Sequence, residues 1–315
     1  MKEALVWHQG AVGDLILSLP AIYSIKKHVR PRSLHLISRS DLSDIFLSNG
    51  IADETSSNER GLYAGFFSGA NVSGGAAEFL GRFDDAYVFM RNRDEIFMEN
   101  LGRHISSVFR VATVTPIGRK EHISHFQLGQ LVALGIDPAV PPCLDYPGAA
   151  ARSGGGAPVV SIHPGSGGRA KRWRLSGFLD LVRVLRGEGR YRFFVLLGPA
   201  ETEIEGECRR FLFEEGIEGE IVAGRPLSSI ASVLMASSLY VGNDSGITHL
   251  AAALGRPVVA IFGPTDPAVW APLGDKVKII RADFPAGGGR GGSGEGSEEL
   301  TADVARAAGE LLAGG

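Results

Sequence analysis

Residues 239–265, LYVGNDSGITHLAAALGRPVVAIFGPT, decide the fold of this chain. The apolar residues 239–241 predict a buried strand, and the small apolar residues 248–254 predict a helix that lies flat on a sheet. Residues 257–262 are rich in β-branched side chains and predict a second strand. A strand, a helix and a second parallel strand in this order indicate an α/β protein.

The turn between that first strand and the helix, residues 242–246 (GNDSG), carries the first candidate site. In a parallel α/β unit such a turn lies at the carboxyl edge of the sheet, with a helix amino terminus behind it. Exposed backbone N–H groups and the helix dipole favour an anion there. The triplet Asp244-Ser245-Gly246 therefore predicts an anion-binding turn.

The length and composition predict an ordinary globular protein of two domains. A chain of 315 residues favours two domains, which we place at residues 1–150 and 151–315. Residues 137–157 are rich in Pro, Gly and Ala, as is typical of an interdomain linker. The composition is 44% hydrophobic and 21% charged, and the net charge of −3 argues against a nucleic-acid-coating protein.

Cysteine and histidine usage predicts no metal site. Cys143 and Cys208 match no zinc spacing, which favours a reducing, cytoplasmic location. His122 and His125 share one face of a helix predicted over 122–134, but no third ligand lies nearby in sequence, so we interpret them as surface histidines. The start of the chain has no signal-peptide pattern, and no apolar run is long enough to span a membrane. Peripheral contact with the inner membrane stays open.

The first half opens with a predicted strand at residues 4–7, a turn at 10–14 (GAVGD) and a helical run over 15–29. Two glycines in the turn let a ligand or a neighbouring chain approach the backbone. The third glycine of the dinucleotide fingerprint and the Gly-Lys-Ser/Thr of a Walker loop are absent, so the turn is weak evidence for a phosphate site. Pro20 inside the helical run predicts a kink or a late start.

Asp14 and two arginines are the polar candidates of this half. Asp14 is either a capping or first-turn aspartate, which suits the helix dipole, or a carboxylate in an interdomain cleft that acts as a base. One residue can do both. Arg91 and Arg93 follow a predicted strand at 86–90, so they either enter the ligand crevice or form a solvated basic turn.

The second half opens with a predicted strand at 158–163 and a glycine-rich turn at 163–173 (HPGSGGRAKRW). The Ser166 hydroxyl, the backbone donors and the Lys171 ammonium predict a phosphate cradle, and the alternative is a flexible basic surface loop. Trp173 favours the ordered loop, because a large aromatic side chain usually anchors a loop on a core.

Two later strand ends carry further candidates. Glu201 follows a predicted strand at 191–197 and either accepts ribose hydroxyls or starts a helix. The triplet Gly263-Pro264-Thr265 ends another strand and could close over a nucleotide. Residues 286–297 are of low complexity, and residues 300–311 predict a final amphipathic helix that could pack back on the first domain.

Five motifs in order resemble glycosyltransferase family nine, the ADP-heptose:lipopolysaccharide heptosyltransferases. They are residues 10–14 with Pro20, residues 163–173, residues 198–201 (GPAE), residues 242–246 with His249, and residues 262–265 (FGPT). The resemblance implies a GT-B fold, in which two Rossmann-like domains face each other across a cleft. It places the acceptor on the first domain and the nucleotide sugar on the second.

The resemblance also implies a reaction, the inverting transfer of a heptose from ADP-heptose to a hydroxyl of a lipopolysaccharide core. It implies Asp14 as the base and Lys171 as the cation that contacts the phosphates. The implied donor contacts are Ser166, Glu201, Asp244, Ser245, Gly246, His249, Gly263, Pro264 and Thr265, and the candidate acceptor contacts are Gly13, Arg91 and Arg93.

These residue types suit an inverting transfer. One carboxylate takes the acceptor proton while the sugar carbon is attacked from the face opposite the leaving group. The departing ADP gains negative charge, which Lys171 and the N–H groups of the helix start could stabilise. No Asp-x-Asp occurs in the chain, so we expect no metal and no cofactor besides the donor substrate. The expected partners are the nucleotide sugar and a lipid-linked oligosaccharide, with no nucleic acid.

Two segments depart from the family pattern, so the prediction rests on the donor side. Residues 286–297 are glycine-rich where many members carry cysteines, and residues 62–77 are rich in small residues where the acceptor side is expected. The alternatives are a GT-B sugar-nucleotide epimerase or hydrolase and a non-catalytic nucleotide-sugar binder. A serine hydrolase is excluded, because Asp244-Ser245-Gly246 lacks the Gly-x-Ser-x-Gly pattern.

Overall fold

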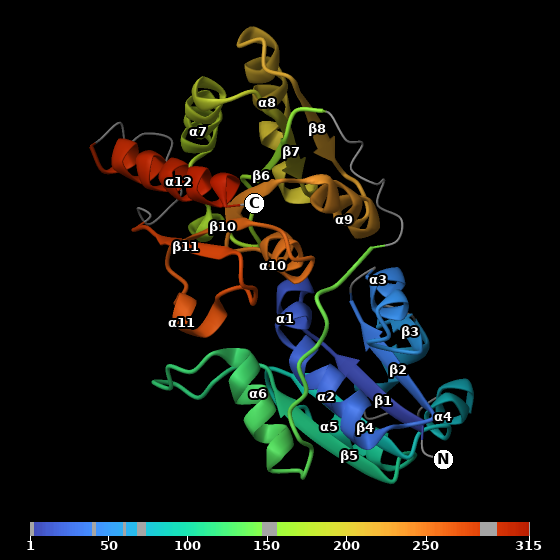
Figure 1. Cartoon of the computed structure of the whole chain (residues 1–315). Helices are drawn as coiled ribbons and strands as arrows, with labels where there is room; N and C mark the ends of the chain where they lie inside the picture. The colour runs from blue at the N-terminus through green and yellow to red at the C-terminus, as the bar shows by residue number, and fades with distance from the viewer. Residues whose placement is uncertain are drawn as a thin grey trace. The chain divides into compact units, whose positions relative to one another are not determined.

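The computed structural model describes residues 3–39, 42–58, 61–67, 74–146, 156–283 and 295–314. The chain divides into two compact units, Met1–Pro142 and Cys143–Gly315, each built on one sheet (Figure 1). We call them the first unit and the second unit. Most of the segment predicted to be of low complexity, and residues 147–155 of the predicted linker, lie outside the described residues.

The sheet of the first unit has the strand order β3-β2-β1-β4-β5, and every pairing is parallel. Its strands are β1 (Glu3–His8), β2 (Ser33–Ser38), β3 (Glu54–Ser57), β4 (Asp85–Met90) and β5 (Ser107–Ala112). Its helices are α1 (Val12–Leu17), α2 (Leu19–Val29), α3 (Ser43–Ser48), α4 (Gly74–Leu80), α5 (Glu95–Gly102) and α6 (Ile123–Val132), with a 3₁₀ helix η1 (Gly61–Phe67).

The sheet of the second unit has the strand order β11-β10-β9-β6-β7-β8 and is also parallel throughout. Its strands are β6 (Val159–His163), β7 (Arg192–Leu197), β8 (Gly219–Ala223), β9 (Leu239–Asn243), β10 (Val258–Phe262) and β11 (Val277–Arg281). Its helices are α7 (Leu175–Glu188), α8 (Thr202–Glu214), α9 (Leu227–Ala236), α10 (Gly246–Ala253), α11 (Pro267–Trp270) and α12 (Glu295–Ala313), with 3₁₀ helices η2 (Arg169–Lys171) and η3 (Pro199–Glu201).

Both sheets are wound in the same order. Counted within each unit, the strands run 3-2-1-4-5 and 3-2-1-4-5-6, which is the order of the dinucleotide-binding fold. The order reverses between β1 and β4 in the first unit and between β6 and β9 in the second. Ligands of such folds bind outside the carboxyl ends of the strands at this switch point. The predicted fold class of two Rossmann-like parallel-sheet domains is confirmed.

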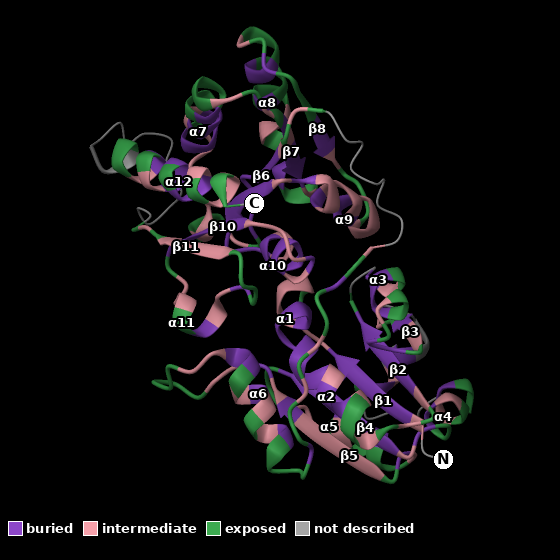
Figure 2. Ribbon diagram, viewed as in Figure 1, coloured by how far each residue is buried: buried purple, intermediate pink, exposed green. Residues whose placement is uncertain are grey.

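Each unit buries its own apolar core (Figure 2). In the first unit, Trp7 on β1 packs against the rings of Tyr63, Phe66 and Phe97, with ring centroids 5.0, 5.5 and 4.9 Å away. In the second unit, α12 packs against α7, β9, β10 and β11 and buries Val304 in the core. The predicted amphipathic final helix is confirmed.

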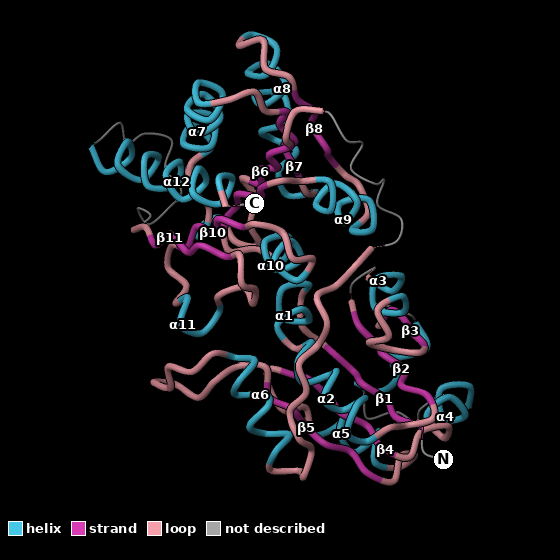
Figure 3. The backbone as a smooth tube through the Cα atoms, viewed as in Figure 1, coloured by secondary structure: helices cyan, strands magenta, loops and turns pink. Residues whose placement is uncertain are grey.

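The helical run predicted over residues 15–29 is broken in two (Figure 3). α1 ends at Leu17 and α2 begins at Leu19, with Ser18 between them. Pro20 lies in the first turn of α2 and has no N–H to donate to Ile16, so an unbroken helix would lose a hydrogen bond there. The kink predicted from Pro20 is therefore present as a break at Ser18.

Candidate functional site

The switch point of the second unit is built around the first turn of α10. Ser245 is the N-cap residue, and its Oγ accepts the Thr248 N–H at 3.4 Å and lies 3.2 Å from Nδ1 of His163. The first N–H groups of a helix have no acceptor within the helix, so those of Gly246 and Ile247 are open to an anion. The positive end of the helix dipole adds to this preference.

Three side chains converge on the carboxylate of Asp244, which is only 5% exposed. Nζ of Lys171 lies 2.7 Å from Oδ2, and the Thr265 hydroxyl donates to the same oxygen at 2.7 Å. Nε2 of His249 lies 3.7 Å from Oδ1. Burial by itself raises the pKa of Asp244, but the interactions with His249, Lys171 and Thr265 outweigh it and lower that pKa to about 2. Asp244 is therefore an anion at neutral pH.

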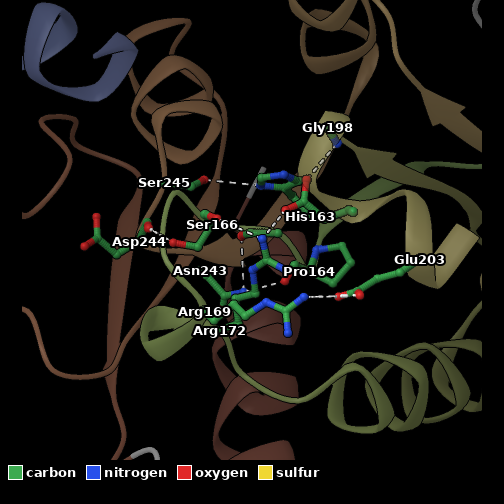
Figure 4. Close-up of polar contacts among 12 residues, drawn as sticks. His163, Pro164, Ser166, Arg169, Arg172, Gly198, Glu203, Asn243, Asp244 and Ser245 are labelled. Atoms are coloured by element: carbon green, nitrogen blue, oxygen red, sulfur yellow. Dashed lines mark hydrogen bonds and ion pairs between the residues drawn. The ribbon is translucent and has the colours of Figure 1, made fainter. Parts of the chain in front are cut away.

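Lys171 has more hydrogen-bond donors at this turn than Asp244 uses. Its side chain is 36% exposed, and an ammonium has three donors, of which Asp244 takes one. Ser166 donates from its hydroxyl to the backbone carbonyl of Asp244 at 2.9 Å, while the carboxylate of Asp244 points away from Ser166 (Figure 4). The loop after β6, the turn after β9 and the segment after β10 thus bring Ser166, Lys171, Asp244 and Thr265 together, although they are far apart in sequence.

Asn243, a residue with no predicted role, connects the loop after β6 to the end of β9. It is fully buried, and its Nδ2 donates to the carbonyls of Pro164 at 2.9 Å and Gly165 at 3.3 Å. Its Oδ1 accepts the N–H of Trp173 at 2.9 Å, so one amide holds both ends of the loop. Trp173 is 4% exposed, which confirms the prediction of an ordered loop. The only signal in the sequence was a polar residue where the strand is otherwise apolar.

Glu201 is buried and both of its oxygens are engaged. It is 4% exposed, its Oε1 accepts from Arg172 at 2.7 Å, and its Oε2 accepts the Gly198 N–H at 2.9 Å. A Cβ on Gly165 would lie 2.5 Å from Cδ of Glu201 and 2.6 Å from Nε2 of His163. Burial, and then the charge of Arg172, lower the pKa of His163 to about 4. The contact of Glu201 with ribose hydroxyls stays a prediction.

Every cation in residues 163–173 faces an acid from another element. The pairs are Lys171 with Asp244 at 2.7 Å, Arg172 with Glu201 at 2.7 Å and Arg169 with Glu203 at 3.2 Å (Figure 4 for the last). The Arg169 pair is exposed, so it contributes little to stability. Together the pairs leave the loop and its partners without net charge.

In the first unit, Asp14 lies in the first turn of α1. Its Oδ2 accepts the N–H of the N-cap residue Ala11 at 3.1 Å, which confirms the capping interpretation. Within the described residues no group donates a hydrogen bond to its Oδ1. The carboxylate is therefore fixed through one oxygen and available at the other, as a base requires.

The candidate acceptor contacts lie at the same switch point. Gly13 is part of α1, and Arg91 and Arg93 follow β4, which pairs with β1. Both arginine side chains are exposed, and Arg93 forms an ion pair with Glu95 at 2.8 Å. Contact of these residues with an acceptor stays a prediction.

The described residues contain no group of three or more His, Cys, Asp or Glu side chains arranged to hold a metal ion. His122 caps α6, and its ring lies 5.7 Å from that of His125. A helix that could cross a membrane, being both long and apolar, is not found among the described residues either.

Comparisons with known sequences locate a family match in the second unit. Residues 142–290 match the sequence model of Glycosyltransferase family 9 (heptosyltransferase). Lipooligosaccharide heptosyltransferase 2 of Haemophilus influenzae is 37% identical over 131 residues, which cover 40% of this chain and 37% of that protein. Lipopolysaccharide heptosyltransferase 2 of Escherichia coli is 33% identical over 138 residues, which cover 39% and 36%. The matched stretch spans little more than a third of these relatives.

Solved structures extend the likeness of fold to the whole chain. The glycosyl transferase family 9 protein of Veillonella parvula superposes with a TM-score of 0.76 at 16% identity, covering 100% of this chain and 98% of that one. The ADP-heptose LPS heptosyltransferase II of E. coli gives 0.73 at 22% identity, covering 100% and 99%. The resemblance drawn from the five sequence motifs is confirmed.

Proposed function

We propose that this chain, which belongs to glycosyltransferase family 9 through its second unit, transfers a heptose from ADP-heptose to a hydroxyl of a lipopolysaccharide core, with inversion at the sugar carbon. One observation carries the proposal. Lys171, Thr265 and His249 converge on Asp244 inside the stretch that matches the family model.

The donor side supplies positive charge where a leaving diphosphate would need it. A diphosphate at the start of α10 would meet the N–H groups of Gly246 and Ile247 and the spare donors of Lys171. When the bond between the sugar carbon and the phosphate oxygen breaks, ADP keeps the electron pair and gains charge. Donors already fixed in place stabilise that charge without rearrangement. These groups supply the positive charge that a metal ion would otherwise supply, so the proposed transfer needs no metal.

Asp244 and Thr265 are the proposed contacts to the donor sugar. Asp244 is ionised at neutral pH, because its pKa is lowered to about 2, and an ionised carboxylate accepts hydrogen bonds from sugar hydroxyls. The hydroxyl of Thr265 already donates to that carboxylate and fixes its direction. Gly263 and Pro264 precede Thr265 and would form the edge of the same site.

Asp14 is the proposed base. Its Oδ1 takes the proton of the acceptor hydroxyl while the acceptor oxygen forms a bond to the sugar carbon. The bond from that carbon to the phosphate oxygen breaks on the opposite face, which inverts the carbon. Gly13, Arg91 and Arg93 are the proposed acceptor contacts, because they lie with Asp14 at the switch point of the first unit. Peripheral membrane contact through a lipid-linked acceptor is part of this proposal.

Mass spectrometry of the acceptor tests the proposal. The purified protein is incubated with ADP-heptose and a heptose-free lipopolysaccharide, and we expect the acceptor to gain one heptose for each ADP released. Free heptose with an unmodified acceptor would contradict transfer and favour a hydrolase or an epimerase. Binding of ADP-heptose with no turnover would contradict it in favour of a non-catalytic binder.

A further inference from the structure

His8, the last residue of β1, is buried where the first unit presents Asp14. It is 0% exposed, and its ring stacks on that of Phe89 in β4 at 5.6 Å between centroids. Both ring nitrogens reach the segment that follows β1. The N–H of Gly10 donates to Nδ1 at 3.1 Å, and Nε2 lies 3.0 Å from Oγ of Ser18.

The hydrogen bonds of Ser18 decide where the imidazole carries its proton. The Ser18 hydroxyl donates its one proton to the backbone carbonyl of Asp14 at 2.8 Å. Nε2 of His8 must therefore be the donor in its contact with Ser18, while Nδ1 must be bare to accept the Gly10 N–H. The ring is thus neutral and held in one tautomer. Burial favours the same state, because it lowers the pKa of His8 to about 3.

Gly10 shows how tightly the ring and the aspartate are packed. A Cβ added at Gly10 would lie 2.6 Å from Cβ of Asp14, 2.7 Å from Cε1 of His8 and 3.0 Å from Oδ2 of Asp14. Real Cβ atoms do not approach this closely, so only glycine fits between the two side chains. A shift of the His8 ring would therefore alter the turn that carries Asp14.

We propose that His8 is a positioning residue for Asp14, acting through Ser18 and Gly10 to fix the turn between β1 and α1. Four hydrogen bonds tie this turn, from Gly10 to His8, from His8 to Ser18, from Ser18 to the Asp14 carbonyl, and from Ala11 to the Asp14 carboxylate. The last bond takes Oδ2, and the other three hold the backbone, so Oδ1 keeps one direction. The inference rests on the proposed role of Asp14 as the base.

The decisive variant is His8→Phe, which keeps a ring of similar size and removes both nitrogens. We expect kcat for heptose transfer to fall about 10²-fold, because a small misplacement of a reacting group has a cost of this order. The KM for ADP-heptose and the Kd for ADP should stay within about twofold, because the proposed donor contacts lie in the second unit. His8→Gln and His8→Asn can each restore one of the two bonds, so both should retain more kcat than His8→Phe.

His35→Phe is the matched control for a purely structural effect. His35 lies on β2 of the same sheet, is 4% exposed, and also has both nitrogens engaged, Nδ1 with Glu54 at 3.1 Å and Nε2 with Ser56 at 2.8 Å. Thermal melting identifies a temperature at which all variants are folded, and kcat is measured there. Full kcat in His8→Phe, or an equal loss in His35→Phe, would overturn the positioning role.

Asp14→Asn, measured in the same series, separates the two proposals. If Asp14→Asn is inactive while His8→Phe is fully active, the result supports Asp14 as the base and contradicts the positioning role of His8. If Asp14→Asn turns over like the wild type, the proposed base is wrong, and the role of His8 falls with it.

Discussion

The first strands of the two units, β1 and β6, end alike. Each ends on a buried histidine, His8 or His163, followed two residues later by a glycine, Gly10 or Gly165. In both places a Cβ on the glycine would collide with the histidine ring, at 2.7 Å in the first unit and 2.6 Å in the second. Burial lowers the pKa of both histidines, to about 3 and about 4, so both rings are neutral.

The two units differ in the carboxylate that meets this glycine. In the second unit it is Glu201, which is 4% exposed and has both oxygens engaged. In the first unit it is Asp14, which is half-buried and has one oxygen engaged by Ala11. The same strand-end geometry therefore supports a buried carboxylate with both oxygens engaged in the second unit. In the first unit it supports a carboxylate with one oxygen available. Substitution of Asp14 should then mainly lower kcat, and substitution of Glu201 should mainly lower the free energy of unfolding.

The largest effect is expected at the available carboxylate. Asp14→Asn keeps the shape and a hydrogen-bond acceptor for Ala11 but cannot take a proton, so kcat should fall about 10³-fold. The free energy of unfolding and the affinity for ADP should barely change. Steady-state ADP release and calorimetric titration with ADP measure the two quantities. Wild-type turnover would remove Asp14 from the chemistry.

Substitution of Glu201, the fully engaged carboxylate, should lower the stability of the fold. Glu201→Gln leaves the mostly buried guanidinium of Arg172 without its counter-charge, which we expect to lower the free energy of unfolding by about 3 kcal/mol. Urea denaturation measures this, with kcat of the folded protein falling far less than in Asp14→Asn. Unchanged stability combined with weakened ADP binding would point instead to a ribose contact.

Substitution of Lys171, the partly exposed cation, should impair the use of ADP-heptose as a substrate. Lys171→Ala should lower kcat/KM for ADP-heptose about 10²-fold, because the leaving diphosphate loses a fixed donor. Lys276→Ala, at an exposed lysine of the same unit, is the control and should have normal kinetics. Equal kinetics in the two variants would move the phosphate site away from the loop after β6.

The smallest effect per residue is a dependence of stability on pH. Both strand-end histidines have folded pKa values, about 3 and about 4, below the ordinary 6.5. Between pH 7 and pH 5 the unfolded chain binds protons that the folded chain does not, so stability falls as the pH falls. We expect a loss of about 2 kcal/mol per histidine over this interval. Urea midpoints at the two pH values measure it, and His8→Phe should show a smaller loss. Equal stability at both pH values would contradict the burial of neutral rings.

Much of the fold could be predicted because its central elements carry clear apolar patterns. The apolar patterns of residues 33–38 and 227–236 predict a strand and a helix, and β2 (Ser33–Ser38) and α9 (Leu227–Ala236) have these bounds. The unpredicted strands β3, β8 and β11 all lie at sheet edges. β3, with the sequence ETSS, has no apolar residue and is recognisable only through its pairing with β2.

The site was predictable as a set of residue types at strand ends, and not as a network. Ser166, Lys171, Asp244 and Thr265 were found because parallel strands bring their carboxyl ends to one edge. The role of Asn243 depends on partners about 70 residues away in the chain, which no local pattern reveals. His8, in an apolar stretch, is indistinguishable in sequence from an ordinary core histidine.

The ion pairs of the loop after β6, which cancel its positive charge, have a kinetic consequence. Because its three cations each face an acid at rest, the loop projects little long-range attraction towards an anion in solution. A nucleotide sugar would then be captured by short-range contacts after diffusion, and its association rate should vary only weakly with ionic strength.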